Sequence, residues 1–210
     1  MQYLTDIGIF ANNPIKSIGK LNAELDKRKV RRAMAQDEID RLMQVASEER
    51  TLIYRLLLGT GLRSTELSLL TPSQIDFERC LLRVEATKTK NKKSDVLPLK
   101  PTLVQSLKEW ISVKHIKAAE RIFSHDHTQI REAFYSDLQA AGIERAGADG
   151  RSVDVHSLRK TFGTMLAMAG VPLTTVQRLM RHSSPLLTAK LYIDVDPLNM
   201  AQALEKLPVE

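Results

Sequence analysis

The sequence predicts a mainly α-helical α+β fold with one small antiparallel β-sheet. Apolar residues recur at helical spacing through most of the chain from residue 36 onward. A strand-like texture, with turn-forming residues between apolar runs, occurs only between Phe77 and Leu99. No internal repeat is present, which argues against a solenoid despite the high helix content.

The length of 210 residues fits one domain with an appendage. Residues 1–33 differ from the rest, because they contain an NNP turn and a basic cluster but no sustained apolar stripe. We therefore interpret 1–33 as a linker or a domain remnant. Its basic cluster either follows a phosphate backbone or is a solvated charge run, and the sequence leaves both readings open. The cluster consists of Lys27, Arg28, Lys29, Arg31 and Arg32.

Two helices are predicted before residue 61. The first begins at Gln36 with an apolar face, and Ser47 is a suitable N-cap for the second. Gly61 then ends this helix, and a new one begins almost at once with Ser64 as its expected N-cap. Arg63 consequently lies at a tight junction between two helices, where its cation is rigidly aimed.

The remaining elements follow from the apolar pattern and from proline and glycine positions. The stretches CLLRVEAT and VLPL read as strands joined by the lysine-rich KTKNKK. Helices are expected from Pro101, from about Thr128 to Gly142, over HSLRKTFGTMLAMAG to Gly170, over PLTTVQRLM, from Ser184-Pro185 and from Asp196-Pro197. Tyr192 is expected well inside the helix that starts at Ser184-Pro185.

Charge and cysteine content limit the class of protein. A net charge of +6 and an isoelectric point near 9.5 permit a polyanionic partner without requiring one. The single cysteine, Cys80, excludes an internal disulfide framework, fits a reducing compartment and is expected to be buried and inert in a strand. The chain lacks a secretory signal and any run of about 20 apolar residues, so we expect a soluble, intracellular protein.

Several polar residues are candidates for chemistry, although each also has a plain structural reading. His156 and Arg159 stand at i and i+3 and project from one helical face. Arg63 is suited to grip two phosphate oxygens with its planar fork, or to pair with Glu66 one turn on. Taken singly, His182 is a helix-end histidine and Tyr192 a half-buried core residue.

The order of these residues is more specific than any one of them: arginine, lysine, HxxR, histidine and a final tyrosine. With this order the chain resembles the tyrosine recombinase (phage integrase) family. The resemblance extends from about Ala35 to Leu204, the family's catalytic domain. It depends on the motifs TGLRSTEL, TKTKNKKSDVLPL, VHSLRKTFGTML, LMRHSS and TAKLY.

The resemblance implies a role for each matched residue. Arg63 and Arg159 would bind the scissile phosphate. His156 and His182 would hydrogen-bond it and assist proton transfer. Tyr192 would attack the phosphorus and form a 3′-phosphotyrosyl bond with DNA.

The family's lysine, in the turn between two strands, would protonate the departing 5′ oxygen. Aligning the TKT motif with the family identifies this lysine as Lys88, whereas counting residues back from Pro98 identifies it as Lys90. We prefer Lys88. The chain departs from the family where Arg181 precedes His182, since glycine is usual there. Either the backbone differs at this point or the additional cation contacts DNA.

The implied activity is that of a site-specific DNA recombinase or integrase of a bacterial or mobile genetic element. It needs no metal, ATP or other cofactor, and the sequence has no Walker-type glycine loop and no convincing carboxylate cluster. The pair His125 and His127 offers too few additional ligands for a metal site. Residues 34–210 would form the catalytic domain and 1–33 an interdomain linker or the remnant of an amino-terminal DNA-binding domain.

The implied partner is double-stranded DNA, with self-association into a tetramer in the synaptic complex and no membrane contact. We expect the cytoplasm as the location. Three alternatives remain: a non-catalytic DNA-binding module of the same fold, a type IB topoisomerase that nicks and rejoins strands, and a basic helical scaffold for protein partners.

Overall fold

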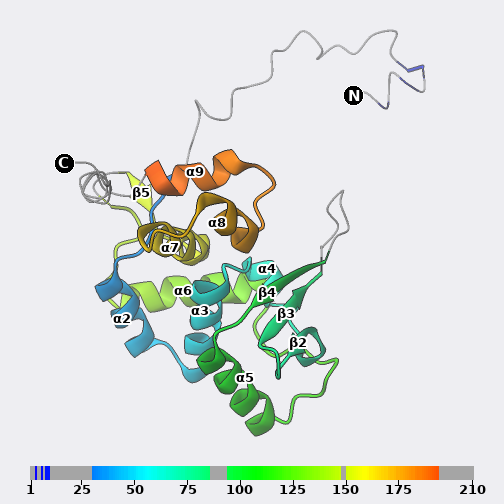
Figure 1. The fold of residues 1–210 in the computed structure, drawn as a ribbon. Coiled ribbons are helices and arrows are strands. Elements are labelled where there is room, and N and C mark those ends of the chain that lie inside the picture. Colours follow the sequence, from blue (N-terminus) through cyan, green and yellow to red (C-terminus); the bar gives the residue numbers. More distant parts are fainter. Residues whose placement is uncertain are drawn as a thin grey trace, which may run out of the picture. The chain divides into compact units, whose positions relative to one another are not determined.

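The computed structural model describes residues 30–85, 94–147 and 150–193, together with Tyr3, Asp6, Gly8 and Ile9. The chain divides into two compact units, Met1–Val30 and Arg31–Glu210. The second unit holds nearly all of the described residues (Figure 1).

Helices dominate this unit, as the sequence predicts. They are α2 (Gln36–Val45), α3 (Glu48–Thr60), α4 (Ser64–Leu67), α5 (Pro101–Val113), α6 (His127–Ala140), α7 (Val155–Met168), α8 (Leu173–Met180) and α9 (Pro185–Ile193), with a 3-10 turn η1 (Pro72–Gln74). The strands are β1 (Val30–Arg31), β2 (Ile75–Asp76), β3 (Leu81–Val84), β4 (Asp95–Pro98) and β5 (Arg151–Ser152). None of the helices in the described ranges combines the length and the apolar character needed to cross a membrane.

The predicted antiparallel sheet is present, with the strand order β2-β3-β4. In the register of β3 and β4, Leu82 lies opposite Leu97, and both side chains are buried. The two-residue strands β1, β2 and β5 were not predicted, since strands this short have no apolar alternation to detect, and β1 and β5 form a second, two-stranded sheet. The lysine-rich connection between β3 and β4 falls on residues 86–93, outside the described residues, so Lys88 and Lys90 are outside them too.

Helix α3 is the centre of the core. Residues on most of its circumference are buried, and it packs against both α5 and α7. Figure 1 shows α7, α8 and α9 grouped on one side of α3 and α6, with α5 and the three-stranded sheet on the other. A buried carboxylate, Asp137 of α6, accepts hydrogen bonds from Arg50 (2.8 and 3.1 Å) and from the Tyr54 hydroxyl (2.7 Å), which fixes α6 against α3.

The end of α3 has the features that the sequence predicts, with one correction. Ser47 caps its start by accepting from the Arg50 N–H, and Gly61 ends it in the left-handed conformation (φ 63°). A Cβ on Gly61 would lie 2.5 Å from Phe162 Cδ1, so only glycine fits there. The N-cap of α4 is Arg63 rather than Ser64, because the extended backbone ends at Arg63 and Ser64 is already helical.

Two further expectations need correction. Cys80 is half-buried and lies in the turn before β3 with φ 54°, not in a strand. Arg31 and Arg32 are not a free basic run, since their side chains pair with Asp154 (2.8 Å) and Glu38 (2.6 Å). Lys27, Arg28 and Lys29 lie outside the described residues.

Candidate active site

The first turn of α7 positions two of the predicted site residues. Asp154 caps this helix and accepts a hydrogen bond from the His156 N–H (2.9 Å). Arg159 follows one turn later and is buried, with 3% of its surface exposed. Its guanidinium donates from Nη1 to the Gly61 carbonyl and from Nη2 to the Met180 carbonyl. Arg159 therefore joins α7 to the α3–α4 junction and to the end of α8.

Arg159 carries its charge in a cationic neighbourhood. Burial, followed by the charges of Arg63 and Arg181, lowers the pKa of Arg159 to about 10, while Glu66 opposes this shift. The guanidinium still holds its proton at neutral pH. These charges act on Arg159 because the α4 turn and the end of α8 both adjoin it.

Arg63 is the exposed cation of this group, since 47% of its side chain is accessible. Its Nη1 donates to Glu66 Oε1 (2.9 Å), and its backbone N–H donates to Glu66 Oε2 (2.8 Å). The pairing predicted from the i, i+3 spacing is thus present. Because one edge of the guanidinium is held by Glu66 and the rest is accessible, the side chain is both oriented and available.

Arg181 turns inward. Its guanidinium forms a two-bond pair with Glu66, Nη1 to Oε1 at 3.0 Å and Nη2 to Oε2 at 2.7 Å. Only 7% of the Arg181 side chain and 8% of the Glu66 side chain are exposed. The expectation that this cation contacts DNA is therefore not supported, since its fork is occupied by a carboxylate.

His182 follows Arg181 directly. Its Nδ1 lies 2.9 Å from the Thr188 hydroxyl, and Thr188 is fully buried at the start of α9. Burial, followed by the charges of Arg159 and Arg63, lowers the pKa of His182 to about 4. The pKa of His156 is lowered as well, by loss of hydration and then by Arg31 and Arg159. Both imidazoles are consequently neutral at pH 7 and able to accept a proton.

Tyr192 is in α9, as predicted, and this helix is described as far as Ile193. Its hydroxyl donates to the Val171 carbonyl in the turn between α7 and α8. Loss of hydration raises the pKa of Tyr192, whereas a neighbouring arginine would lower it. The structure thus brings Arg63, His156, Arg159 and His182 together and holds the Tyr192 hydroxyl apart from their charges.

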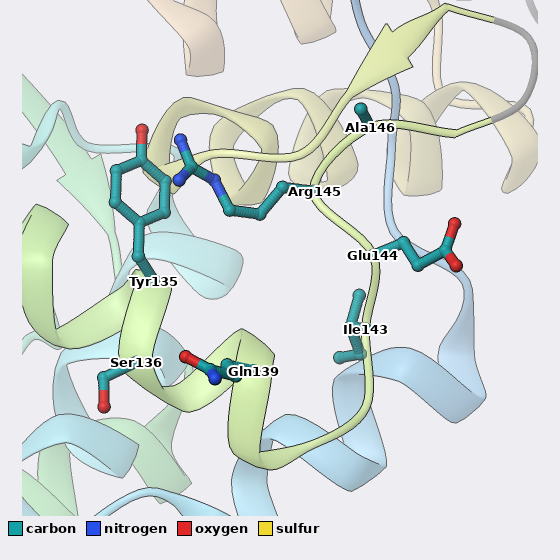
Figure 2. Close-up of a pocket in the computed structure, with 7 residues that line it drawn as sticks. All are labelled: Tyr135, Ser136, Gln139, Ile143, Glu144, Arg145 and Ala146. Atoms are coloured by element: carbon teal, nitrogen blue, oxygen red, sulfur yellow. The ribbon is translucent and has the colours of Figure 1, made fainter.

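Two other features do not join this cluster. His125 pairs with Glu49 (3.2 Å), and no group of three or more potential metal ligands occurs among the residues that the structure describes. A pocket of about 630 Å³ lies between α6 and the segment leading to β5 (Figure 2). Arg145 covers the Tyr135 ring there, with its guanidinium carbon 3.7 Å from the ring centre, and the pocket shares no lining residue with the cluster.

Sequence reasoning identified four of the clustered residues but missed the groups that hold them. The role of Glu66 as acceptor for two arginines was only half predicted, because Arg181 is 115 positions away in the sequence. Thr188 and Val171 carried no signal, since a hydroxyl inside an apolar helix and a backbone carbonyl look ordinary in a sequence.

Comparison with known proteins is consistent with this geometry. The model of the "Phage integrase family" matches residues 32–198. The tyrosine recombinase XerC of Thermodesulfovibrio yellowstonii is 26% identical over 97% of this chain and 70% of its own length. The catalytic domain of bacteriophage HP1 integrase superimposes with a TM-score of 0.62 at 26% identity, covering 85% of this chain and 96% of that one.

A third similar structure is the Tn1549 transposon integrase in complex with transposon right end DNA. It has a TM-score of 0.69 and 21% identity, and the match covers 84% of this chain and 66% of that chain. This chain therefore spans about two thirds of the Tn1549 chain. At this identity the likeness concerns the fold.

The family match covers far more than half of the chain, and its span contains the whole cluster around Arg159. The mainly helical fold with a small three-stranded sheet agrees with the solved catalytic domains. The chain belongs to the phage integrase family and carries the catalytic domain of a tyrosine recombinase, the class of enzymes that cleave and rejoin DNA.

Proposed function

We propose that this chain cuts and rejoins double-stranded DNA at a specific site through a covalent 3′-phosphotyrosine at Tyr192. The observation that carries the proposal is the meeting of Arg63, Arg159, His156 and His182 at one point of the fold. The DNA complex of the similar Tn1549 integrase supports DNA as the substrate.

In this mechanism the two arginines recognise the scissile phosphate. Arg63 offers the accessible part of its guanidinium to the phosphate oxygens. Arg159 contributes mainly its positive charge, because it is buried and donates two of its five N–H groups to backbone carbonyls. Together they stabilise the additional negative charge of the pentavalent phosphorane.

Proton transfer is assigned to the histidines and a lysine. The Tyr192 phenol, with an ordinary pKa near 10, must lose its proton as its oxygen attacks phosphorus. Neutral His156 or His182 accepts that proton, and Lys88, with Lys90 as the alternative, donates one to the departing 5′ oxygen. Rejoining runs the same steps in reverse with a 5′-hydroxyl of the same or a partner strand. The bond energy stays in the phosphotyrosyl linkage, and no cofactor takes part.

Tyr192 must first leave its present partner. Its hydroxyl is bonded to the Val171 carbonyl and cannot be an attacking group while that bond remains. We therefore propose that binding of DNA shifts the end of α9 relative to the α7–α8 turn and brings the hydroxyl to the phosphate.

The larger assembly is proposed from family membership. Residues 34–210 act as the catalytic domain and 1–33 as a linker or the remnant of an amino-terminal DNA-binding domain. Copies of the chain associate on DNA as a tetramer in the synaptic complex, in the cytoplasm of a bacterial host. Whether the reaction integrates, excises or resolves DNA depends on the recognised sequence.

The test uses a pool of nicked duplexes of random sequence, since the target site is unknown. On a nicked substrate the cut fragment diffuses away, so covalent protein–DNA adducts accumulate and can be isolated and sequenced. We expect the parent chain to form adducts in the presence of a chelator. Tyr192→Phe should form none while binding DNA as before, and Tyr135→Phe, a change at another partly buried tyrosine, should keep full activity. Adducts that persist in Tyr192→Phe would refute the assignment.

A non-catalytic DNA-binding module is the second candidate, and the bond between Tyr192 and Val171 favours it. In such a module the phosphate contacts would remain while the tyrosine stays in its present position. Binding without any adduct from the pool, in a parent chain that is fully folded, would select this function.

A further inference from the structure

We infer that Arg181, which stands where the family usually has glycine, is a positioning residue of the active site. Its guanidinium keeps Glu66 from neutralising Arg63, so Arg63 stays available to a phosphate. This inference rests on the proposed phosphate-binding role of Arg63. It concerns a residue that touches neither the DNA nor the reacting atoms.

The backbone at Arg181 explains why glycine is suitable there. Arg181 ends α8 in the left-handed conformation, with φ 52° and ψ 44°. Glycine adopts this conformation freely, whereas a residue with a Cβ is strained in it. An arginine in this place must therefore make interactions that outweigh the strain.

Those interactions are with a single carboxylate. Each Glu66 oxygen accepts one hydrogen bond from Arg181 and one from Arg63, so its four acceptor positions are filled. Burial alone would raise the pKa of Glu66, but the hydrogen bond from Arg181 and those from Arg63 lower it, and the carboxylate stays charged. Glu66 thus joins the α4 turn that carries Arg63 to the turn that carries His182.

Charge balance gives the pairing its consequence. Three guanidinium groups, Arg63, Arg159 and Arg181, act together with one carboxylate, Glu66. If Arg181 were glycine, Arg63 would be the one cationic side chain still hydrogen-bonded to this buried carboxylate among the described residues. Glu66 would then draw the Arg63 fork onto itself and compete with the DNA phosphate for it.

The second donor edge of Arg181 is also informative. Its Nε is buried without a hydrogen-bond partner in the structure. A buried guanidinium N–H without a hydrogen-bond partner destabilises the folded state, so the other interactions of Arg181 must offset this cost. The gain that retains it is the hold on Glu66.

The fork geometry distinguishes positioning from charge alone. Lysine in place of Arg181 keeps the positive charge but cannot bind both Glu66 oxygens side by side. If only charge mattered, Arg181→Lys would behave like the parent. If the fork matters, Arg63 is less well placed in Arg181→Lys, and catalysis suffers more than DNA binding.

The experiment compares Arg181→Gly, Arg181→Lys and the double variant Arg181→Gly/Glu66→Gln. Single-turnover adduct formation is measured on duplexes recovered from the random pool, and affinity on a duplex of unrelated sequence at low salt. We expect Arg181→Gly to lower the cleavage rate constant about 10- to 100-fold, as displaced catalytic groups do. It should also weaken DNA binding. Adding Glu66→Gln should restore much of both, because the competing carboxylate is gone. Arg181→Lys should bind like the parent and cleave more slowly.

Arg50→Ala is the matched control, since Arg50 also grips a buried carboxylate with two bonds but lies about 16 Å from Gly61 along α3. It should lower the melting temperature without slowing cleavage by the folded fraction. The inference is overturned if Arg181→Gly cleaves and binds like the parent, or if Glu66→Gln fails to improve it. A parent chain that forms no adduct would refute the proposed function instead, and the affinity series would still decide the role of Arg181.

Discussion

Replacing Arg159 with lysine should destabilise the whole catalytic domain as well as the active site. The side chain is buried and donates to two buried backbone carbonyls, those of Gly61 and Met180. Lysine keeps the charge, but its single ammonium cannot reach both carbonyls from one position. One carbonyl therefore loses its partner and gains no water in exchange.

The expected magnitude follows from these bonds. A buried acceptor left without a donor costs about 1–3 kcal/mol, and a compact, strongly hydrated ammonium is harder to bury than a guanidinium. We expect Arg159→Lys to lower the free energy of unfolding by about 2–3 kcal/mol in total. At about 2–4 °C per kcal/mol for a domain of this size, the melting temperature should fall by about 4–12 °C.

Thermal unfolding followed by circular dichroism measures this change, with urea unfolding as a second measure of the free energy. Arg41→Lys is a matched control, because Arg41 also donates to two carbonyls, those of Ala141 and Gly142, from a much more exposed position. Its melting temperature should change little. If Arg159→Lys unfolds at the parent's temperature, the two carbonyl bonds do not contribute to stability and the reasoning fails.

Two further predictions concern α9 and the histidines. A Cβ on Gly163 would lie 2.5 Å from Leu191 Cδ1, so Gly163→Ala should displace α9 and suppress adducts at Tyr192. Gly59→Ala is the control and should be tolerated, because its Cβ would lie 3.4 Å from its nearest neighbour. Adducts formed at the parental rate by Gly163→Ala would contradict this prediction. The folded-state pKa of His182, about 4, lies below the unfolded value of about 6.5. Unfolded chains thus bind more protons, and stability should decline as the pH falls from 6.5 towards 4. His182→Gln should flatten that part of the urea-derived stability curve, and an unchanged slope would refute the shift.

The fold was predictable because its signals are local. Helix ends at Ser47, Gly61 and Pro101 follow from the backbone preferences of these residue types, and apolar spacing identifies the helices between them. The errors have local causes too. The left-handed turn at Cys80 was missed because no glycine occurs there to indicate it. The N-cap is Arg63 rather than Ser64 because the Glu66 side chain accepts the Arg63 N–H.

The sequence was sufficient to predict which residues form the site, but not how they are arranged in space. The residue order identifies Arg63, His156, Arg159 and His182, but the bonds that hold them join segments about 100 positions apart in the chain. No local pattern encodes such a pairing. The bond from Tyr192 to the Val171 carbonyl is equally invisible, since every residue has a carbonyl and only the packing of α9 selects one.

The same bonds stabilise the domain and arrange the site, and this determines how activity losses should be interpreted. Arg159 fastens the Gly61 carbonyl next to Arg63 and the Met180 carbonyl next to Arg181. A variant at Arg159 therefore disturbs the α3–α4 junction and the turn before His182, even if it never touches a phosphate. The reduced cleavage rate of such a variant therefore combines three effects: the lost phosphate contact, the lower stability and the disturbed pairing of Glu66. The contribution of the phosphate contact is known only when the other two are measured separately. Arg63 lacks this double role, because it is exposed and has one side-chain partner among the described residues. The kinetic effect of Arg63→Ala should thus be the cleaner measure of phosphate binding, and it should appear with little change in melting temperature.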